Sequence, residues 1–121
     1  MILGLRTAIY PTSNLAAAKN WYSQVLDRQP YFDEPFYVGF NVGGFELGLV
    51  PDGQSGTSGP QPLWGVTDAA AALSRLLDLG AKELDPVSEV GGGIKVAAVT
   101  DPFGNRFGII ENPHFDPGSV R

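Results

Sequence analysis

The sequence predicts an α+β protein made of two similar halves, each with a strand, a capped helix and about three further strands. Two segments repeat apolar residues at helical spacing, and each follows a residue that favours a helix N-terminus, Asn14 or Asp68. Segments in which apolar and polar residues alternate, a pattern typical of strands, follow both helices. Because one helix covers only one face of a four-stranded sheet, the other face of each half is free to line a cleft.

The first half starts with an apolar segment, residues 2–10, which predicts a strand. Asn14 then caps a helix predicted over residues 15–26. Its apolar positions share the spacing of one helix face: Leu15, Ala18, Tyr22, Val25 and Leu26. We interpret Trp21 and Tyr22 as packing residues of this helix rather than as ligand contacts.

A β-hairpin is predicted after Pro30. Residues 36–42 and 45–50 alternate, and Gly43-Gly44 between them is typical of a tight hairpin turn. The next segment, residues 51–60, is rich in glycine, serine and proline, which predicts a flexible connector rather than a nucleotide-binding loop.

The second half repeats this order. A short strand is predicted over residues 63–66, and Asp68 caps a helix predicted over residues 69–79, with Gly80 as the glycine after its end. Three strands follow, near residues 81–84, 94–99 and 106–111. Before the last strand, Asp101-Pro-Phe-Gly-Asn105 has the residues of a tight turn in which Gly104 or Asn105 takes a positive φ.

Length and composition narrow the possible functions. A chain of 121 residues predicts one domain, 1–121, with halves 1–52 and 60–113 and a linker over 53–59. A net charge of −5 without a basic run disfavours nucleic acid and anionic membranes as partners. The absence of cysteine excludes disulfides, thiolate catalysis and thiolate-bound zinc. No apolar run could span a membrane and no signal peptide is evident, so we expect a cytoplasmic protein.

Several short motifs run in order along nearly the whole chain: Leu5-Arg-Thr-Ala-Ile-Tyr-Pro11, Asn14-Leu15, Trp21-Tyr22 with Leu26, Trp64-Gly-Val-Thr-Asp68, Leu79-Gly-Ala81, Asp101-Pro-Phe-Gly-Asn105 and Glu111-Asn112. In these motifs the chain resembles the vicinal oxygen chelate superfamily, which includes glyoxalases, bleomycin resistance proteins, extradiol dioxygenases and fosfomycin resistance enzymes. The resemblance implies tandem βαβββ units that form a U-shaped mixed sheet around a cavity. It also implies a homodimer.

Metalloenzymes of this superfamily hold a divalent metal on strands that face the cavity, and the resemblance places the ligand positions on Thr7, Glu46, Gln61 and Gly108. Only Glu46 is a strong oxygen ligand, because threonine and glutamine are weak neutral ligands and glycine has no side chain. The only histidine, His114, lies in a proline-flanked segment after the last strand, where we interpret it as structural or exposed. We therefore expect no metal and no other cofactor.

Alternation along the strands sorts their residues into two faces. The face predicted to lie under the helices carries Phe45, Leu47, Leu49, Trp64, Phe107 and Ile109. The opposite face is mostly apolar with a few polar groups, as in small-molecule sites: Leu5, Thr7, Ile9, Glu46, Gly48, Gln61, Leu63, Arg106, Gly108 and Ile110. The predicted ligand-binding residues are Thr7, Glu46, Gln61, Leu63, Arg106 and Gly108. Gly108 is expected to leave space for the ligand, so that phenylalanine there would block binding while the fold stays intact.

Glu46 is the predicted polar anchor and the candidate catalytic residue. Its alternative role is an ion pair with Arg106 or simple exposure. Arg106 could clamp an anionic group or neutralise Glu46 or Glu111. Aromatic residues could reach or cover the cavity mouth, from a strand or from loops: Phe36, Tyr37 and Phe40, and Phe32 and Phe103.

Three functions remain open. The first is a small-molecule-binding protein of the glyoxalase/bleomycin resistance type without a catalytic metal. The second is a glyoxalase- or dioxygenase-like enzyme, a lyase, isomerase or oxygenase, whose metal site is degenerate or shared. The third is a metal-free proton-transfer enzyme that uses Glu46 as its base.

Overall fold

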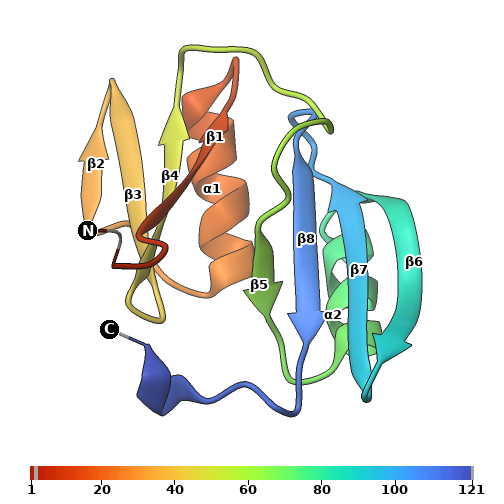
Figure 1. Ribbon diagram of the computed structural model, residues 1–121. Coiled ribbons are helices and arrows are strands. Elements are labelled where there is room, and N and C mark those ends of the chain that lie inside the picture. Colours follow the sequence, from red (N-terminus) through yellow and green to blue (C-terminus); the bar gives the residue numbers. More distant parts are fainter. Residues whose placement is uncertain (2, 121) are drawn as a thin grey trace. The chain divides into compact units, whose positions relative to one another are not determined.

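The computed structural model describes residues 1 and 3–120, and the chain forms two compact units. The N-terminal unit comprises Gly4–Gly56 together with Phe103–Asn105. The C-terminal unit is built mainly from Thr57–Pro102 and from the chain after Asn105. Each unit has one four-stranded mixed sheet and one long helix, which confirms the predicted α+β class and the repeated βαβββ order (Figure 1).

The N-terminal sheet has the strand order β1-β4-β3-β2, with β1 parallel to β4 and the other neighbours antiparallel. Its elements are β1 (Thr7–Pro11), α1 (Leu15–Leu26), β2 (Phe32–Glu34), β3 (Tyr37–Val42) and β4 (Phe45–Val50). Helix α1 has the predicted bounds, whereas β1 is shorter than predicted. Residues 3–6 are outside any strand, and Ile2 of the predicted strand lies outside the described residues.

Helix α1 begins and ends for local chemical reasons. The Asn14 side chain accepts a hydrogen bond from the Ala17 amide at 3.1 Å, as predicted for an N-cap. Asp27 closes the helix with a positive φ of 54°. The helix packs on β3 and β4 through three buried residues, Ala18, Trp21 and Tyr22, which confirms the packing role of the last two.

The core of the N-terminal unit lies under α1. Phe40, Leu47 and Leu49 are fully buried there, and Tyr10 of β1 packs its ring against Tyr22 at 5.9 Å between centroids. The neighbours that alternate with them on the opposite face include the exposed Ile9, the half-buried Glu46 and two glycines, Gly39 and Gly48. The predicted sorting into a helix side and an open side is confirmed for Leu47, Leu49 and Ile9, whereas Phe40, predicted to reach the cavity mouth, lies on the helix side.

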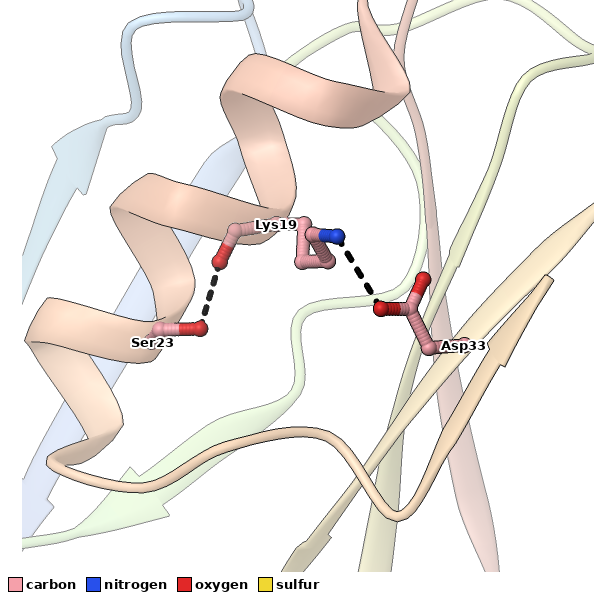
Figure 2. A network of polar contacts seen from close by, with 3 residues as sticks. All are labelled: Lys19, Ser23 and Asp33. Atoms are coloured by element: carbon pink, nitrogen blue, oxygen red, sulfur yellow. Dashed lines mark hydrogen bonds and ion pairs between the residues drawn. The ribbon is translucent and has the colours of Figure 1, made fainter. Parts of the chain in front are cut away.

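Strand β2, at the sheet edge, was not predicted. Figure 2 shows Asp33 reaching across to α1, where the Lys19 Nζ lies 3.0 Å from its Oδ2, while the Ser23 hydroxyl donates to the Lys19 carbonyl at 2.8 Å. Because Asp33 faces the helix, its neighbours Phe32 and Glu34 face the other side. The prediction that Phe32 lies on a loop is wrong, and Phe36, predicted in a strand, lies in the turn before β3.

The C-terminal sheet has the equivalent order β5-β8-β7-β6, with β5 parallel to β8. Its elements are β5 (Leu63–Gly65), α2 (Ala69–Asp78), β6 (Lys82–Gly91), β7 (Ile94–Thr100) and β8 (Arg106–Glu111), followed by a short 3₁₀ helix, η1 (Pro117–Ser119). Strand β6 extends well beyond the predicted residues 81–84, with register shifts along its pairing to β7.

Helix α2 repeats the capping of α1. The Asp68 side chain accepts from the Ala71 amide at 3.1 Å, and Gly80 follows the helix with a φ of 103°. A further contact joins the helix to its sheet, because Oε1 of Glu111 accepts from the Ala69 amide at 2.8 Å. The helix buries Leu73 and Leu76, and the strand residues on the helix side, Val99, Phe107 and Ile109, are also buried.

The turn before β8 is formed as predicted, with the positive φ, 92°, at Gly104. Its last residue, Asn105, is buried and joins two segments of the N-terminal unit. The Asn105 amide donates to the Pro11 carbonyl at 2.6 Å, and the Gly56 amide donates to the Asn105 Oδ1 at 3.2 Å. Neither α1 nor α2 is long and apolar enough to cross a membrane, and the same holds for every helix in the described part of the chain.

Candidate functional site

Strand register defines the helix-free face of the N-terminal sheet. Glu46 on the central strand β4 lies between Thr7 of β1 and Asn41 of β3. The next row along the strands consists of Ile9, Gly48, Gly39 and Phe32. Two of the predicted ligand-binding residues, Thr7 and Glu46, are therefore direct cross-strand neighbours on this face.

Two tyrosines converge on Glu46. The Tyr31 hydroxyl donates a hydrogen bond to Oε1 of Glu46, and the Tyr37 hydroxyl donates to Oε2. Tyr31 directly precedes the edge strand β2, and Tyr37 begins β3, the strand paired with β4. The carboxylate is thus held by one neutral donor on each oxygen.

Two glycines make this arrangement possible. Gly39 and Gly48 are paired in register on β3 and β4, and both are buried. A Cβ on Gly48 would overlap the Tyr37 hydroxyl. A Cβ on Gly39 would lie 3.3 Å from both the Tyr31 ring and Oε1 of Glu46. Because neither glycine has a side chain, the two tyrosine rings can lie in the space above them.

The Glu46 carboxylate also affects the acidity of both hydroxyls. Its hydrogen bond is the main cause that raises the pKa of Tyr31 above the ordinary tyrosine value, with smaller contributions from burial and from the Glu46 charge. The pKa of Tyr37 is raised mainly by burial of the phenol, and then by its hydrogen bond to Glu46 and by the nearby charge. Both residues are therefore neutral hydrogen-bond donors at physiological pH.

Apolar and aromatic groups surround this polar centre. The Phe32 ring contacts the Tyr37 ring edge-on with centroids 6.0 Å apart, and the Phe36 ring contacts Phe32 at 5.9 Å. Several of these side chains keep much of their surface exposed, including Tyr31 (65 %) and Ile9 (58 %). An anchored carboxylate beside exposed apolar surface is the composition expected of a small-molecule site.

The ion pair predicted for Arg106 with Glu46 or Glu111 is not formed. Its guanidinium pairs with Asp85 of β6 and not with Glu46 or Glu111. Glu111 instead caps α2, and Glu46 forms its hydrogen bonds with tyrosines. Thr100 lies beside Arg106 in register, and the guanidinium Nε is buried without a hydrogen-bond partner.

Gly108 does not open the space that was predicted beside it. It lies in register between Leu63 of β5 and Ala98 of β7. A Cβ on Gly108 would lie 2.7 Å from Cδ2 of Leu63 and 3.0 Å from the Pro62 carbonyl oxygen. These two contacts argue against the expectation that phenylalanine at this position leaves the fold intact. Leu63 itself is half exposed, and Gln61, which precedes β5, is exposed.

The four positions inferred for metal ligands do not form a matched set. In the N-terminal unit the Thr12 amide donates to the Val50 carbonyl, and in the C-terminal unit the Val66 amide donates to the Ile110 carbonyl. Val50 and Ile110 therefore occupy equivalent positions in the two units. Gly48 and Gly108, each two residues earlier, are equivalent as well. Both positions lack a donor side chain, and the space beside each is filled by a neighbouring residue. These residues do not fit a divalent metal, and no cluster of three or more His, Asp or Glu side chains suited to one occurs among the described residues.

His114 lies after β8 on the exposed surface of the C-terminal unit. Its Nε2 is 2.6 Å from the carbonyl oxygen of Gly92, in the turn between β6 and β7. This contact holds the segment after β8 against that turn and agrees with a structural role.

Comparisons with known proteins agree with this architecture. The model of the Glyoxalase/Bleomycin resistance protein/Dioxygenase superfamily matches residues 4–109. The chain therefore belongs to this superfamily, which confirms the resemblance seen in its motifs. No curated protein is a significant match to the sequence.

Solved structures with the same fold include proteins with different named activities. A glyoxalase-related enzyme from Fulvimarina pelagi is similar with a TM-score of 0.79 and 20 % identity, over 98 % of this chain and 95 % of that one. A genomically encoded fosfomycin resistance protein from Listeria monocytogenes has a TM-score of 0.77 and 13 % identity, over 94 % of this chain and 97 % of that one. Lactoylglutathione lyase from Agrobacterium tumefaciens has a TM-score of 0.76 and 18 % identity, over 96 % of this chain and 100 % of that one. At these identities the similarity establishes the fold alone.

Proposed function

We propose that this protein binds a small organic molecule on the helix-free face of the N-terminal sheet, without a catalytic metal. The observation that carries the proposal is the Glu46 carboxylate, fixed by Tyr31 and Tyr37 among exposed apolar groups. Thr7, its cross-strand neighbour, belongs to the same proposed site. The other four residues predicted for the same pocket, Gln61, Leu63, Arg106 and Gly108, belong to the C-terminal unit, and their part in binding stays a prediction.

Binding is a better match to this geometry than proton transfer by Glu46. Both carboxylate oxygens already accept a hydrogen bond from a tyrosine, which stabilises Glu46 as a fixed acceptor of hydrogen bonds. A general base must also reach a substrate proton directly, in competition with these donors. We therefore keep the proton-transfer and degenerate metalloenzyme functions as alternatives of lower rank.

The assembly and location belong to the same proposal. A homodimer is supported by the unpaired outer edges of β1 and β2 in the N-terminal sheet, since exposed edges favour pairing or covering by another chain. Light scattering of the purified chain at micromolar concentration tests this, and a stable monomer would contradict it. A cytoplasmic location is proposed as well.

The binding proposal is tested by titrating chelator-treated protein with a neutral aromatic probe, naphthylmethanol, followed by ligand-observed NMR. We expect a dissociation constant on the order of 1 mM or lower, as for a fragment of this size. Gly48→Ala should weaken binding severalfold, because the new Cβ displaces the Tyr37 hydroxyl. Gly56→Ala is the control, since a Cβ there has no neighbour within 4 Å. Absence of binding, or equal binding by both variants, would contradict the proposed site.

A further inference from the structure

We propose that the natural ligand carries a protonated primary or secondary amine, which Glu46 and the hydroxyl oxygens of Tyr31 and Tyr37 bind together. This inference rests on the proposed small-molecule site. It adds the charge of the ligand and the pattern of hydrogen-bond donors that the site selects.

The first reason is the uncompensated charge of Glu46. Both of its hydrogen-bond partners are neutral hydroxyls. In the described part of the chain, the ion pairs join Lys19 to Asp33 and Arg106 to Asp85, and neither includes Glu46. A half-buried carboxylate without a cationic partner among the described residues favours a cationic ligand group.

The second reason is the pattern of acceptors. A carboxylate offers about four acceptor positions, so two remain after the tyrosine hydrogen bonds. Each tyrosine oxygen can also accept a hydrogen bond while it donates its own proton to Glu46. The raised pKa of both tyrosines keeps these protons in place well above neutral pH. An ammonium group, which has only donors, complements this cluster, whereas an anionic group does not.

The third reason is the aromatic surroundings. Phe32 contacts Tyr37 and Phe36, and the ring faces of such residues attract cations. They also provide apolar surface for the body of the ligand. The net charge of −5 raises the local concentration of cations around the protein and slows the approach of anions.

A matched series of probes tests the inference. Naphthylmethylamine, naphthylmethanol and naphthylacetate have similar aromatic bodies and differ in charge. At neutral pH and low salt, we expect the amine to bind about tenfold more tightly than the alcohol, and the acetate to bind most weakly, because one charged hydrogen bond contributes about this factor. Added salt should reduce the difference.

Variants identify the group responsible. Glu46→Gln keeps the size of the side chain and removes its charge, so it should abolish the preference for the amine and leave binding of the alcohol nearly unchanged. Glu89→Gln, at an exposed position on β6, makes the same change in residue type and net charge and should preserve the preference. Tyr37→Phe, which keeps the ring and removes one acceptor, should weaken amine binding several-fold.

Three results would overturn the inference, and they differ from failure of the proposed function. Equal binding of amine and alcohol, or loss of the preference in Glu89→Gln, would exclude Glu46 as a cation-binding residue while the small-molecule site stands. If the trimethylammonium analogue binds as tightly as the amine, the role of N–H donors is wrong. Failure of every probe to bind would overturn the proposed function and the inference together.

Discussion

At the scale of single residues, the helix-free face of the N-terminal sheet depends on which side chains are present and which are absent. Tyr31 and Tyr37 donate to Glu46, and Gly39 and Gly48 leave the space that their rings occupy. Glu46 was predicted as the polar anchor from strand alternation, and its position on this face is confirmed. Tyr31 was missed, because it precedes its strand and no periodicity places its side chain.

The pairing of the two glycines, by contrast, could have been found in the sequence. Residues equally distant from the Gly43-Gly44 turn face each other in a two-residue hairpin, which pairs Gly39 with Gly48. Two glycines side by side in the middle of a sheet leave a gap, which often marks a place where another group approaches the backbone closely. The hairpin register therefore predicts the paired glycines of the site, which the alternation of apolar and polar residues does not.

The raised pKa of Tyr37 predicts how stability depends on pH. Its folded pKa lies above the unfolded value of about 10, so the stabilising contribution is complete below pH ~10 and is lost as pH rises through the folded pKa. Tyr37→Phe should therefore show a smaller decrease in the free energy of unfolding between pH 9 and 11 than the wild type, on chemical denaturation. Parallel decreases in the two proteins would contradict a raised pKa for the partly buried Tyr37 hydroxyl.

Gly108 gives a second prediction at this scale. Gly108→Ala should lower the free energy of unfolding by about 1–3 kcal/mol, because its Cβ would meet Leu63 and the Pro62 carbonyl. Gly65→Ala on β5, where a Cβ has no neighbour within 4 Å, should leave stability unchanged or slightly higher. Urea denaturation of both variants measures the difference. Equal stabilities would show that the space beside Gly108 is open after all.

At the scale of elements, the helices were predicted well and the edge strands poorly. Helical spacing and the two N-caps predicted the bounds of α1 correctly. They predicted those of α2 to within one residue. Strand β2 was missed because its three residues are too few for a clear alternation. Strand β6 is longer than the predicted residues 81–84 and continues through Pro86, because β6 is an edge strand, where proline is tolerated.

The N-caps allow a direct test of this scale. Asn14→Ala and Asp68→Ala should each lower the free energy of unfolding by about 1 kcal/mol, since each removes a hydrogen bond to an amide of the first helical turn. Asn20→Ala, at an exposed position inside α1, should change stability by no more than about 0.5 kcal/mol. The three variants can be compared by thermal and urea unfolding. A cap variant as stable as Asn20→Ala would contradict the assigned helix start.

At the scale of the whole molecule, the chain has a superfamily fold whose named relatives include a lyase and a fosfomycin resistance protein. Their fold does not determine the chemistry of this chain, which depends on the residues at its own site. Here Gly48 and Gly108 occupy equivalent positions in the two units, and neither offers a ligand for a metal. The sequence motifs predicted the family, and the register was needed to identify these equivalent positions.

A metal-free function has a direct consequence for the purified protein. Calorimetric titration with zinc, nickel, manganese and ferrous iron should show only weak binding, because Glu46 alone is a strong ligand among the four inferred positions. Elemental analysis of protein purified without a chelator should give less than stoichiometric metal. A sub-micromolar metal site that is lost in Glu46→Gln would disprove the proposal and favour the metalloenzyme alternative.

The most direct test of the central claim is a map of backbone amide shifts while naphthylmethylamine is added to chelator-treated protein. We predict that the largest shifts fall on the helix-free face of the N-terminal sheet, at Gly39, Gly48 and the strand residues beside Glu46. Gly56 and the amides of α2 should change little. Shifts that are confined to the C-terminal unit, or that appear only after a divalent metal is restored, would contradict a metal-free binding site at Glu46.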